Sequence, residues 1–363
     1  MVTPHLPPHQ AANALLPHLL GGALAERGHG VRYLTFGDLK DTRDVCYVRR
    51  RPGPRGTRVP QALEAFDTWR KCRALVRQAE VVHIHSNTWM NQVAARVAVR
   101  ERRPYILTHY GTEIWHYDGR DPRFRRLNAR AAHVAFYSQA LLERGRELGV
   151  PLREASVVYP PVADAFRPLA AKERTEIKRR YAPDVGLLLL NVKRLHPLAD
   201  HATLLDAMAR VRAKRDDARL LIAGTGECEA ALKAQARRLG LAGHVHFLGL
   251  VPNEEIASLQ NGADLFVLSS ALEATPTVAL EALAAGTPVV STDSPGGLEL
   301  NALFGDDVHV VPKNDPEALA RAILDEAAAP RRTREGTAAL IESRFRVSGV
   351  VDRYLALYAE AVA

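Results

Sequence analysis

The feature that most constrains the fold is an alternation of short apolar runs with stretches of helical periodicity. The runs form two series along the chain: 31–36, 81–85, 105–110, 133–138 and 156–159, then 187–192, 218–223, 244–248, 263–268, 288–292 and 308–311. Amphipathic segments such as 202–213 and 229–239 lie between them. Such alternation is typical of parallel strands covered by helices on both faces, with ligands at the carboxyl ends of the strands. We therefore predict doubly wound α/β domains.

The length of 363 residues exceeds what one hydrophobic core usually holds, so two domains are expected. The pattern pauses in a proline-rich segment, 160–168, which a charged segment, 172–180, follows. We place domains at 1–165 and 166–345, with a final helical segment at 346–363.

The start of the chain departs from the usual α/β order. Residues 1–9 form a proline-rich loop with almost no strand ahead of it, whereas 11–27 have helical periodicity and 31–36 have strand character. We expect a βαβ unit whose first strand is missing or shortened.

Composition indicates an ordinary globular chain, with 47% hydrophobic and 25% charged residues. The apolar runs are far shorter than the roughly 20 residues of a membrane span, and no signal peptide opens the sequence. Three scattered cysteines have neither metal-ligand spacing nor an even count. We predict a cytoplasmic protein with reduced thiols.

The net charge of +8 is unevenly divided. Residues 1–168 contain 26 Lys and Arg against 15 Asp and Glu, whereas the rest contains 23 against 26. A basic first half, including the loop 49–58, predicts an anionic partner: an acidic acceptor, or the inner face of an anionic membrane. The alternative is a solvated surface and loop without a partner.

The stretch 268–293 joins a buried strand, a loop and a helix. Thr275 can cap the helix, and Pro276 suits its first position. The N–H groups of a helix start attract phosphate, whereas Glu273 and Glu281 beside it would repel phosphate and accept hydrogen bonds from hydroxyls. Phosphate with hydroxyls describes a nucleotide sugar; the alternative is that both carboxylates are solvated charges near a helix start.

Four segments together resemble the second half of the family 4 retaining glycosyltransferases of the GT-B fold: 191–198, 221–227, 245–252 and 268–293. Weaker likeness at 27–31, 81–85 and 108–113 extends the resemblance over nearly the whole chain. It implies two tandem Rossmann-like domains that face a cleft, with the final helix packed back on the first domain.

The resemblance also implies roles for individual residues. Glu273 would bind hydroxyls of the donor sugar, Glu281 the ribose, and Arg194 the diphosphate, while His109 would face the sugar from the first domain. Other positions that match the donor site are Gly224, Gly226, Leu250, Ala274, Thr275, Pro276, Thr277, Gly296 and Gly297.

The sequence departs from the family pattern at several positions. Ala199 stands where a lysine usually neutralises the diphosphate, and Lys193, which replaces a glycine, is a substitute for that charge. Ala11 and Ala12 replace a glycine pair near the donor phosphates.

The function expected from the resemblance is transfer of a hexose-type sugar, with retention, to a glycan, lipid-linked or small-molecule acceptor. A phosphate oxygen would take the acceptor's proton. The sequence has no Asp-x-Asp triplet, so neither metal nor cofactor is expected beyond the nucleotide-sugar co-substrate, and no nucleic-acid partner is expected. Two alternatives stay open: a GT-B-like nucleotide-sugar epimerase, and a degenerate homologue that binds a nucleotide sugar or a partner without turnover.

Overall fold

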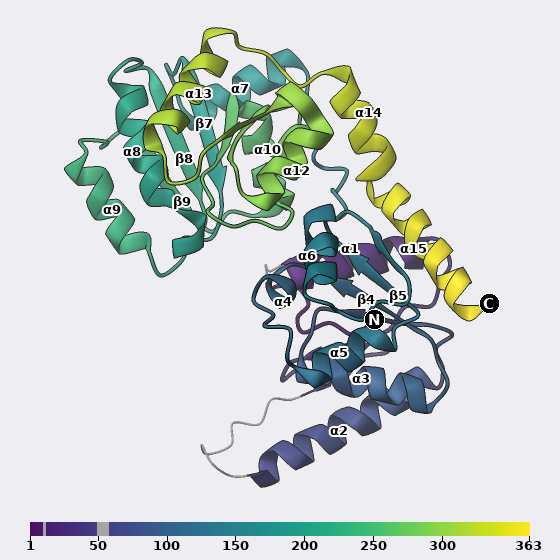
Figure 1. Ribbon diagram of the computed structural model, residues 1–363. Helices are drawn as coiled ribbons and strands as arrows, with labels where there is room; N and C mark the ends of the chain where they lie inside the picture. The colour runs from purple at the N-terminus through teal and green to yellow at the C-terminus, as the bar shows by residue number, and fades with distance from the viewer. Residues whose placement is uncertain (10–11, 49–57) are drawn as a thin grey trace. The chain divides into compact units, whose positions relative to one another are not determined.

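The computed structural model describes residues 1–9, 12–48 and 58–363, and the side chains of all of these except 58–65. Ala11 and the predicted basic loop at 49–57 lie outside the described residues. Residue contacts divide the chain into two compact units (Figure 1). The first unit combines Met1–Pro161 with Val347–Ala363, and the second is Val162–Arg346.

The first unit contains a parallel sheet. Its strands are β1 (Tyr33–Phe36), β2 (Val45–Val48), β3 (Val82–His85), β4 (Tyr105–His109), β5 (His133–Phe136) and β6 (Ala155–Val157). β1 pairs with β2, and β3 to β6 pair in chain order. Val2 makes parallel bridges to Leu34 of β1 and to Ile84 of β3, so it joins the two sets of strands. The expected shortened first strand is therefore present as a segment around Val2.

Helices cover this sheet on both faces. They are α1 (Ala12–Glu26), α2 (Arg58–Val76), α3 (Trp89–Arg100), α4 (Thr112–Trp115), α5 (Pro122–Ala129), α6 (Gln139–Glu147) and α15 (Val347–Val362). α1 and α15 pack together through Leu20, Leu24, Val350 and Tyr354, against sheet residues such as Ala135. Helices α2, α3 and α5 form a second packed group. The final helix thus buries its apolar stripe in the first unit.

The second unit contains six parallel strands in the order β12-β11-β10-β7-β8-β9. They are β7 (Leu187–Val192), β8 (Ala218–Ala223), β9 (Val245–Gly249), β10 (Leu265–Leu268), β11 (Val289–Thr292) and β12 (Val308–Val311). The helices are α7 (Ala171–Tyr181), α8 (His201–Arg212), α9 (Glu229–Arg238), α10 (Asn253–Gly262), α11 (Thr277–Ala284), α12 (Pro295–Phe304), α13 (Pro316–Ala328) and α14 (Glu335–Arg344), with single 3-10 turns at Pro197–Ala199 and Gly305–Asp307.

The central strand β7 shows why this fold forms. Leu187 and Leu189 pack with α8, α9 and α13 in one apolar core, while Leu188 and Leu190 are equally buried on the opposite face. Burial of successive residues on both faces requires an apolar run without alternation, which is what the sequence contains. The predicted doubly wound α/β class is confirmed. Within the described part of the chain, no helix has both the length and the apolar character to cross a bilayer.

Candidate functional site

The predicted site residues of the second unit gather at the carboxyl ends of its strands. The strand order reverses between β7 and β10, and in sheets of this class the ligand-binding crevice lies at such a reversal, outside the carboxyl ends of the strands. The loops that follow these two strands are tied together, because the Ala271 N–H donates to the Leu198 carbonyl at 2.9 Å. Below them, Asn191 Nδ2 donates to the Val267 carbonyl at 2.8 Å. These bonds hold the two loops in a defined position.

Lys193 and Glu273 form an ion pair in this place. Lys193 Nζ lies 2.5 Å from Glu273 Oε1, and the two side chains are 28% and 10% exposed. The backbone of Lys193 is held by an N–H bond to the Ala223 carbonyl at 3.0 Å. One predicted donor-binding carboxylate is therefore neutralised by the predicted substitute cation, although 80 residues separate them in the sequence.

Arg194 points to a different carboxylate. Its Nη2 lies 3.2 Å from Glu227 Oε2, and the Arg194 side chain is 71% exposed. His196 Nε2 lies 3.5 Å from the other oxygen of Glu227. A hydrogen bond from the backbone N–H of Glu227 itself, together with the charge of Arg194, lowers the pKa of this carboxyl group. Sequence reasoning missed Glu227, although it directly follows the predicted glycine loop 224–226.

Gly224 and Gly226 are required by close backbone contacts with the loop after β7. A Cβ at Gly224, whose φ is +146°, would lie 2.0 Å from the Lys193 carbonyl oxygen. A Cβ at Gly226 would lie 2.3 Å from the Leu195 carbonyl oxygen. The two glycines therefore set the position of the backbone that carries Lys193 and Arg194. Leu250, which follows β9, is 63% exposed.

The start of α11 differs from the prediction by one residue. Thr277, not Pro276, is the first helical residue, and Pro276 is the N-cap with φ −74° and ψ 92°. That ψ is extended, and the Pro276 carbonyl accepts from the N–H of Ala279 at 2.9 Å, so the proline stands outside the helix. The expectation that Thr275 is the N-cap is wrong, because Pro276 holds that position.

Glu281 lies on α11 in a different environment from Glu273. Among the described residues, no hydrogen bond or ion pair reaches its carboxyl group. Burial raises the pKa of Glu281 from 4.5 to about 8. The site therefore contains one carboxylate paired with a cation and one held without a partner.

The loop from Glu273 to Thr275 rests on the start of α12. The N–H of Gly296 donates to the Glu273 carbonyl at 2.9 Å. A Cβ at Gly296 would lie 2.9 Å from the Ala274 carbonyl oxygen, and one at Gly297 would lie 2.1 Å from the Thr292 carbonyl oxygen. Gly296 is thus required by close packing of the loop on α12, and Gly297 by close packing of α12 on the end of β11.

Ala199 is a small, buried residue in the 3-10 turn Pro197–Ala199. It is 4% exposed, and its carbonyl accepts a bond of 2.8 Å from the Ser269 hydroxyl. The position where the family has a lysine therefore serves here to pack the loop after β7 against β10.

Two of the predicted site residues that the structure describes belong to the first unit. His109, at the end of β4, is fully buried; its Nε2 lies 2.8 Å from Asn128 Oδ1 and its Nδ1 lies 3.5 Å from Glu113 Oε1. Burial acts to raise the pKa of Glu113, but His109 and the Tyr110 N–H outweigh it and lower that pKa. Ala12 is the exposed first residue of α1.

Two family descriptions match the chain, one in each part. Glycosyltransferase Family 4 matches residues 18–166, and Glycosyl transferases group 1 matches residues 173–335. The chain belongs to the family 4 glycosyltransferases. The resemblance stated above is thereby confirmed, and the protein is an enzyme of the glycosyltransferase class.

Two curated relatives show the range of similarity. An uncharacterized glycosyltransferase of Methanocaldococcus jannaschii is 28% identical over 347 residues, which cover 88% of this chain and 86% of that protein. D-inositol 3-phosphate glycosyltransferase 2 of Catenulispora acidiphila is 34% identical over 212 residues, 55% of this chain and 48% of that protein. The match therefore spans about half the length of the second relative.

A solved structure shares the architecture of this family 4 chain. HepE of Anabaena, in complex with UDP and glucose, superposes with a TM-score of 0.79 at 18% identity, covering 99% of this chain and 98% of that one. At this identity the likeness concerns the fold, which is that of the GT-B glycosyltransferases.

Proposed function

We propose that this chain transfers a hexose-type sugar, with retention, from a nucleoside-diphosphate sugar to an acceptor. The observation that carries the proposal is the arrangement of charges at the carboxyl ends of β7 and β10. Cations and N–H groups suit phosphate, and carboxylates suit hydroxyls; a nucleotide sugar needs both sets of groups side by side.

The proposed roles follow from the position of each group. Arg194 and Lys193 would neutralise the diphosphate, together with the first N–H groups of α11. Lys193 is 2.5 Å from Glu273, so it would share its charge between that carboxylate and a phosphate. Glu273 would then accept hydrogen bonds from the sugar hydroxyls.

The unpartnered Glu281 is the proposed ribose-binding group. Ribose hydroxyls would donate to this carboxyl group, whose pKa burial raises to about 8. The exposed Leu250 and its neighbours would contact the base through the backbone.

For the chemical step we propose that the acceptor hydroxyl attacks on the face that the diphosphate leaves. The bond from the anomeric carbon to the phosphate oxygen breaks as the bond to the acceptor oxygen forms, and the acceptor's proton passes to that phosphate oxygen. Arg194 and Lys193 would stabilise the charge that develops on the leaving group. We propose that they do this without a divalent metal and that no cofactor besides the co-substrate takes part, since the sequence contains no Asp-x-Asp triplet.

The acceptor side is proposed to be anionic and to bind the basic first unit. Four arginines, Arg96, Arg123, Arg126 and Arg130, line one cavity of about 100 Å³ between α3 and α5. Such a cluster attracts phosphate groups, of a soluble acceptor or of an anionic membrane surface. The name of one curated relative contains a phosphorylated compound, D-inositol 3-phosphate. We place the reaction in the cytoplasm, with contact to the inner membrane face when the acceptor is lipid-linked.

A thermal-shift screen of UDP-, GDP- and ADP-sugars tests donor binding, and slow donor hydrolysis tests turnover. We expect one donor class to raise the melting temperature and to release its nucleoside diphosphate. Glu273→Ala and Arg194→Ala should abolish that release, whereas Glu317→Ala on the exposed face of α13 should leave it intact. Loss of activity on adding EDTA would contradict the metal-independent step.

A second candidate function is binding without turnover, and the buried Ala199 favours it because one family cation is absent there. It predicts calorimetric binding of a nucleotide sugar with no product from any mixture of donors and acceptors. Deuterium from solvent in the recovered donor sugar would instead indicate an epimerase.

A further inference from the structure

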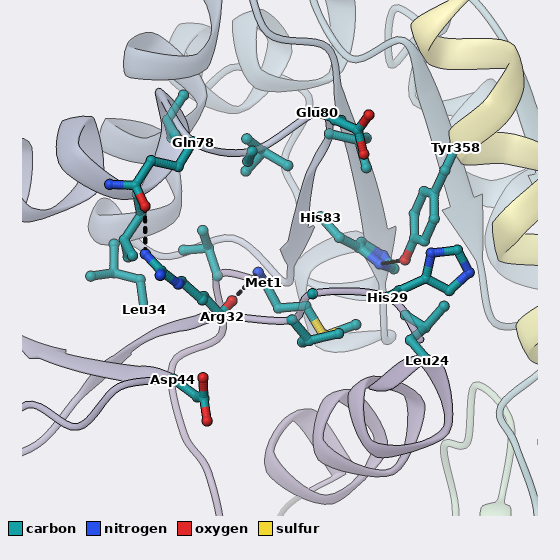
Figure 2. A pocket seen from close by; sticks show the side chains of 18 of the residues that line it. Met1, Leu24, His29, Arg32, Leu34, Asp44, Gln78, Glu80, His83 and Tyr358 are labelled. Atoms are coloured by element: carbon teal, nitrogen blue, oxygen red, sulfur yellow. Dashed lines mark hydrogen bonds between the residues drawn. The ribbon is translucent and has the colours of Figure 1, made fainter. Parts of the chain in front are cut away.

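A charged side chain that already has a protein partner must give up that partner before it can bind a ligand. The first unit shows a mild case beside a cavity of about 480 Å³, where Arg32 Nη1 donates to the neutral amide oxygen of Gln78 at 2.7 Å (Figure 2). In the second unit the partners are carboxylates, and the cations are Lys193 and Arg194. Which of these cations a ligand can recruit therefore depends on the cost of leaving each carboxylate.

The two cations are held to different degrees. Arg194 and its partner Glu227 are 71% and 49% exposed. Lys193 and its partner Glu273 are only 28% and 10% exposed, and Lys193 Nζ lies 2.5 Å from Glu273 Oε1. Water screens an exposed ion pair, so breaking it costs little, whereas breaking a largely buried pair leaves an uncompensated charge. Arg194 is therefore free to bind an anion, and Lys193 is not.

The backbone on both sides of the Lys193–Glu273 pair is fixed. The Lys193 N–H donates to the Ala223 carbonyl at 3.0 Å, and a Cβ at Gly224 would lie 2.0 Å from the Lys193 carbonyl oxygen. The Glu273 carbonyl accepts from the Gly296 N–H at 2.9 Å. A change of partners at this place is therefore a rotation of side chains. Lysine suits such a change, because its ammonium group carries three donors on a flexible stem.

The ligand groups that can replace Lys193 on Glu273 are hydrogen-bond donors without negative charge. Sugar hydroxyls are donors, so they can satisfy the Glu273 carboxylate when Lys193 leaves it. Phosphate groups are anionic acceptors, which the same carboxylate repels. A nucleoside diphosphate without a sugar therefore offers Glu273 no new partner from its phosphates, and Lys193 stays in place.

We propose that Lys193 is a specificity-determining residue that distinguishes a sugar-loaded nucleotide from the free nucleoside diphosphate. The inference rests on the proposed function, in which Glu273 binds the donor sugar and Arg194 the diphosphate. When sugar hydroxyls satisfy Glu273, Lys193 turns to the diphosphate and adds a second positive charge beside Arg194. After transfer the sugar is gone, Lys193 returns to Glu273, and the hold on the released nucleoside diphosphate weakens.

The test measures binding of nucleoside diphosphates, so it does not require the identity of the sugar. UDP, GDP and ADP are titrated by calorimetry into the unchanged chain and into Glu273→Gln, whose neutral amide imitates a carboxylate already satisfied by a sugar. Glu273→Gln should raise the affinity for the best-bound diphosphate about tenfold, because Lys193 is then free to bind the phosphates. Adding Lys193→Met to Glu273→Gln should remove that gain.

Glu227→Gln is the matched control, because it frees Arg194 by the same chemical change. Since both members of that pair are exposed, the affinity for the same diphosphate should change less than about threefold. The double variant of Glu273 and Lys193 leaves neither charge of the pair unpaired, so it keeps the comparison possible even if Lys193→Met alone fails to fold.

Two results would overturn the inference while leaving the proposed function intact. One is a diphosphate affinity that Glu273→Gln does not raise. The other is a gain that persists in the double variant, since Glu273 would then only repel the phosphates and Lys193 would have no part in the effect. If neither UDP, GDP nor ADP binds to any of these chains, the proposed donor site itself is refuted, and the inference fails with it.

Discussion

Replacing Glu281 by glutamine should stabilise the second unit in a pH-dependent way. Burial raises the pKa of Glu281 to about 8, against 4.5 for an exposed glutamic acid. Between these two values the folded chain keeps the proton and the unfolded chain releases it. Stability must therefore fall as the pH rises from 4.5 to 8, since the folded state binds more protons in that window.

The size of the effect follows from about 1.4 kcal/mol for each pH unit of difference. At pH 7 the carboxyl group should cost about 3 kcal/mol of unfolding free energy, and at pH 8 about 4 kcal/mol. Glu281→Gln cannot ionise, so it escapes this cost. Any constant cost of burying the amide cancels when differences between pH values are taken.

The measurement is urea denaturation of both chains between pH 5.5 and 8. The second unit contains no tryptophan, so its unfolding is followed by far-UV circular dichroism, and tryptophan fluorescence of the first unit serves as an internal control. The advantage of Glu281→Gln should grow by about 1.4 kcal/mol per pH unit. The exposed Glu254→Gln on α10 should show a nearly constant difference. A constant or shrinking advantage for Glu281→Gln would refute the reasoning.

Three further predictions concern the second unit. Lys193→Met should cost about 1–3 kcal/mol of unfolding free energy in denaturation experiments, because it leaves the 10% exposed Glu273 unpaired. Arg194→Met should lower the nucleotide affinity measured by calorimetry, with little loss of stability. Gly226→Ala should lower the unfolding free energy by about 2 kcal/mol or more in the same denaturation experiments, because the new Cβ would collide with the Leu195 carbonyl. The control Gly336→Ala, which has open space at its Cβ, should be neutral or stabilising. Burial opposes ionisation of Asp307, but bonds from Thr337 Oγ1 at 2.6 Å and the Arg334 N–H at 2.8 Å lower its pKa. The stability that the ionised Asp307 contributes should therefore be lost as the pH falls below about 4. Urea titrations of Asp307→Asn should show a flatter dependence of the unfolding free energy on pH in this acid range.

The sequence predicts the strands of the second unit well because burial on both faces leaves an unmistakable pattern. β7 and β8 coincide with the predicted apolar runs 187–192 and 218–223. Ser138, at the end of the predicted run 133–138, caps α6, with its hydroxyl accepting from the Leu141 N–H at 3.1 Å. By contrast, β2 was not predicted, because four residues at the edge of a sheet carry too short a pattern to be distinguished from a loop.

The pairing of charges could not be predicted, because it depends on which strands are neighbours. Lys193 follows β7 and Glu273 follows β10, and only the pairing of these two strands brings their side chains together. The same holds for Arg194 and Glu227, since β7 also pairs with β8. Residue types and motif order in the sequence indicate which charged side chains belong to the site. Which side chains pair with one another depends on which strands are neighbours in the sheet.

Strand order also bears on the departure from the family pattern at Ala199. A cation after β7 can act at the crevice either from a turn further along the loop or from the residue that directly follows the strand. Ala199 is buried in its turn and bonded through its carbonyl to Ser269, so that turn packs the loop instead of carrying charge. Lys193 directly follows the strand, and it reaches the crevice because Gly224 allows the backbone of the β8 loop to pass against it. The cation and the glycine that makes room for it therefore act together, and a lysine placed at 199 would have to disrupt the packing of this loop before it could replace Lys193.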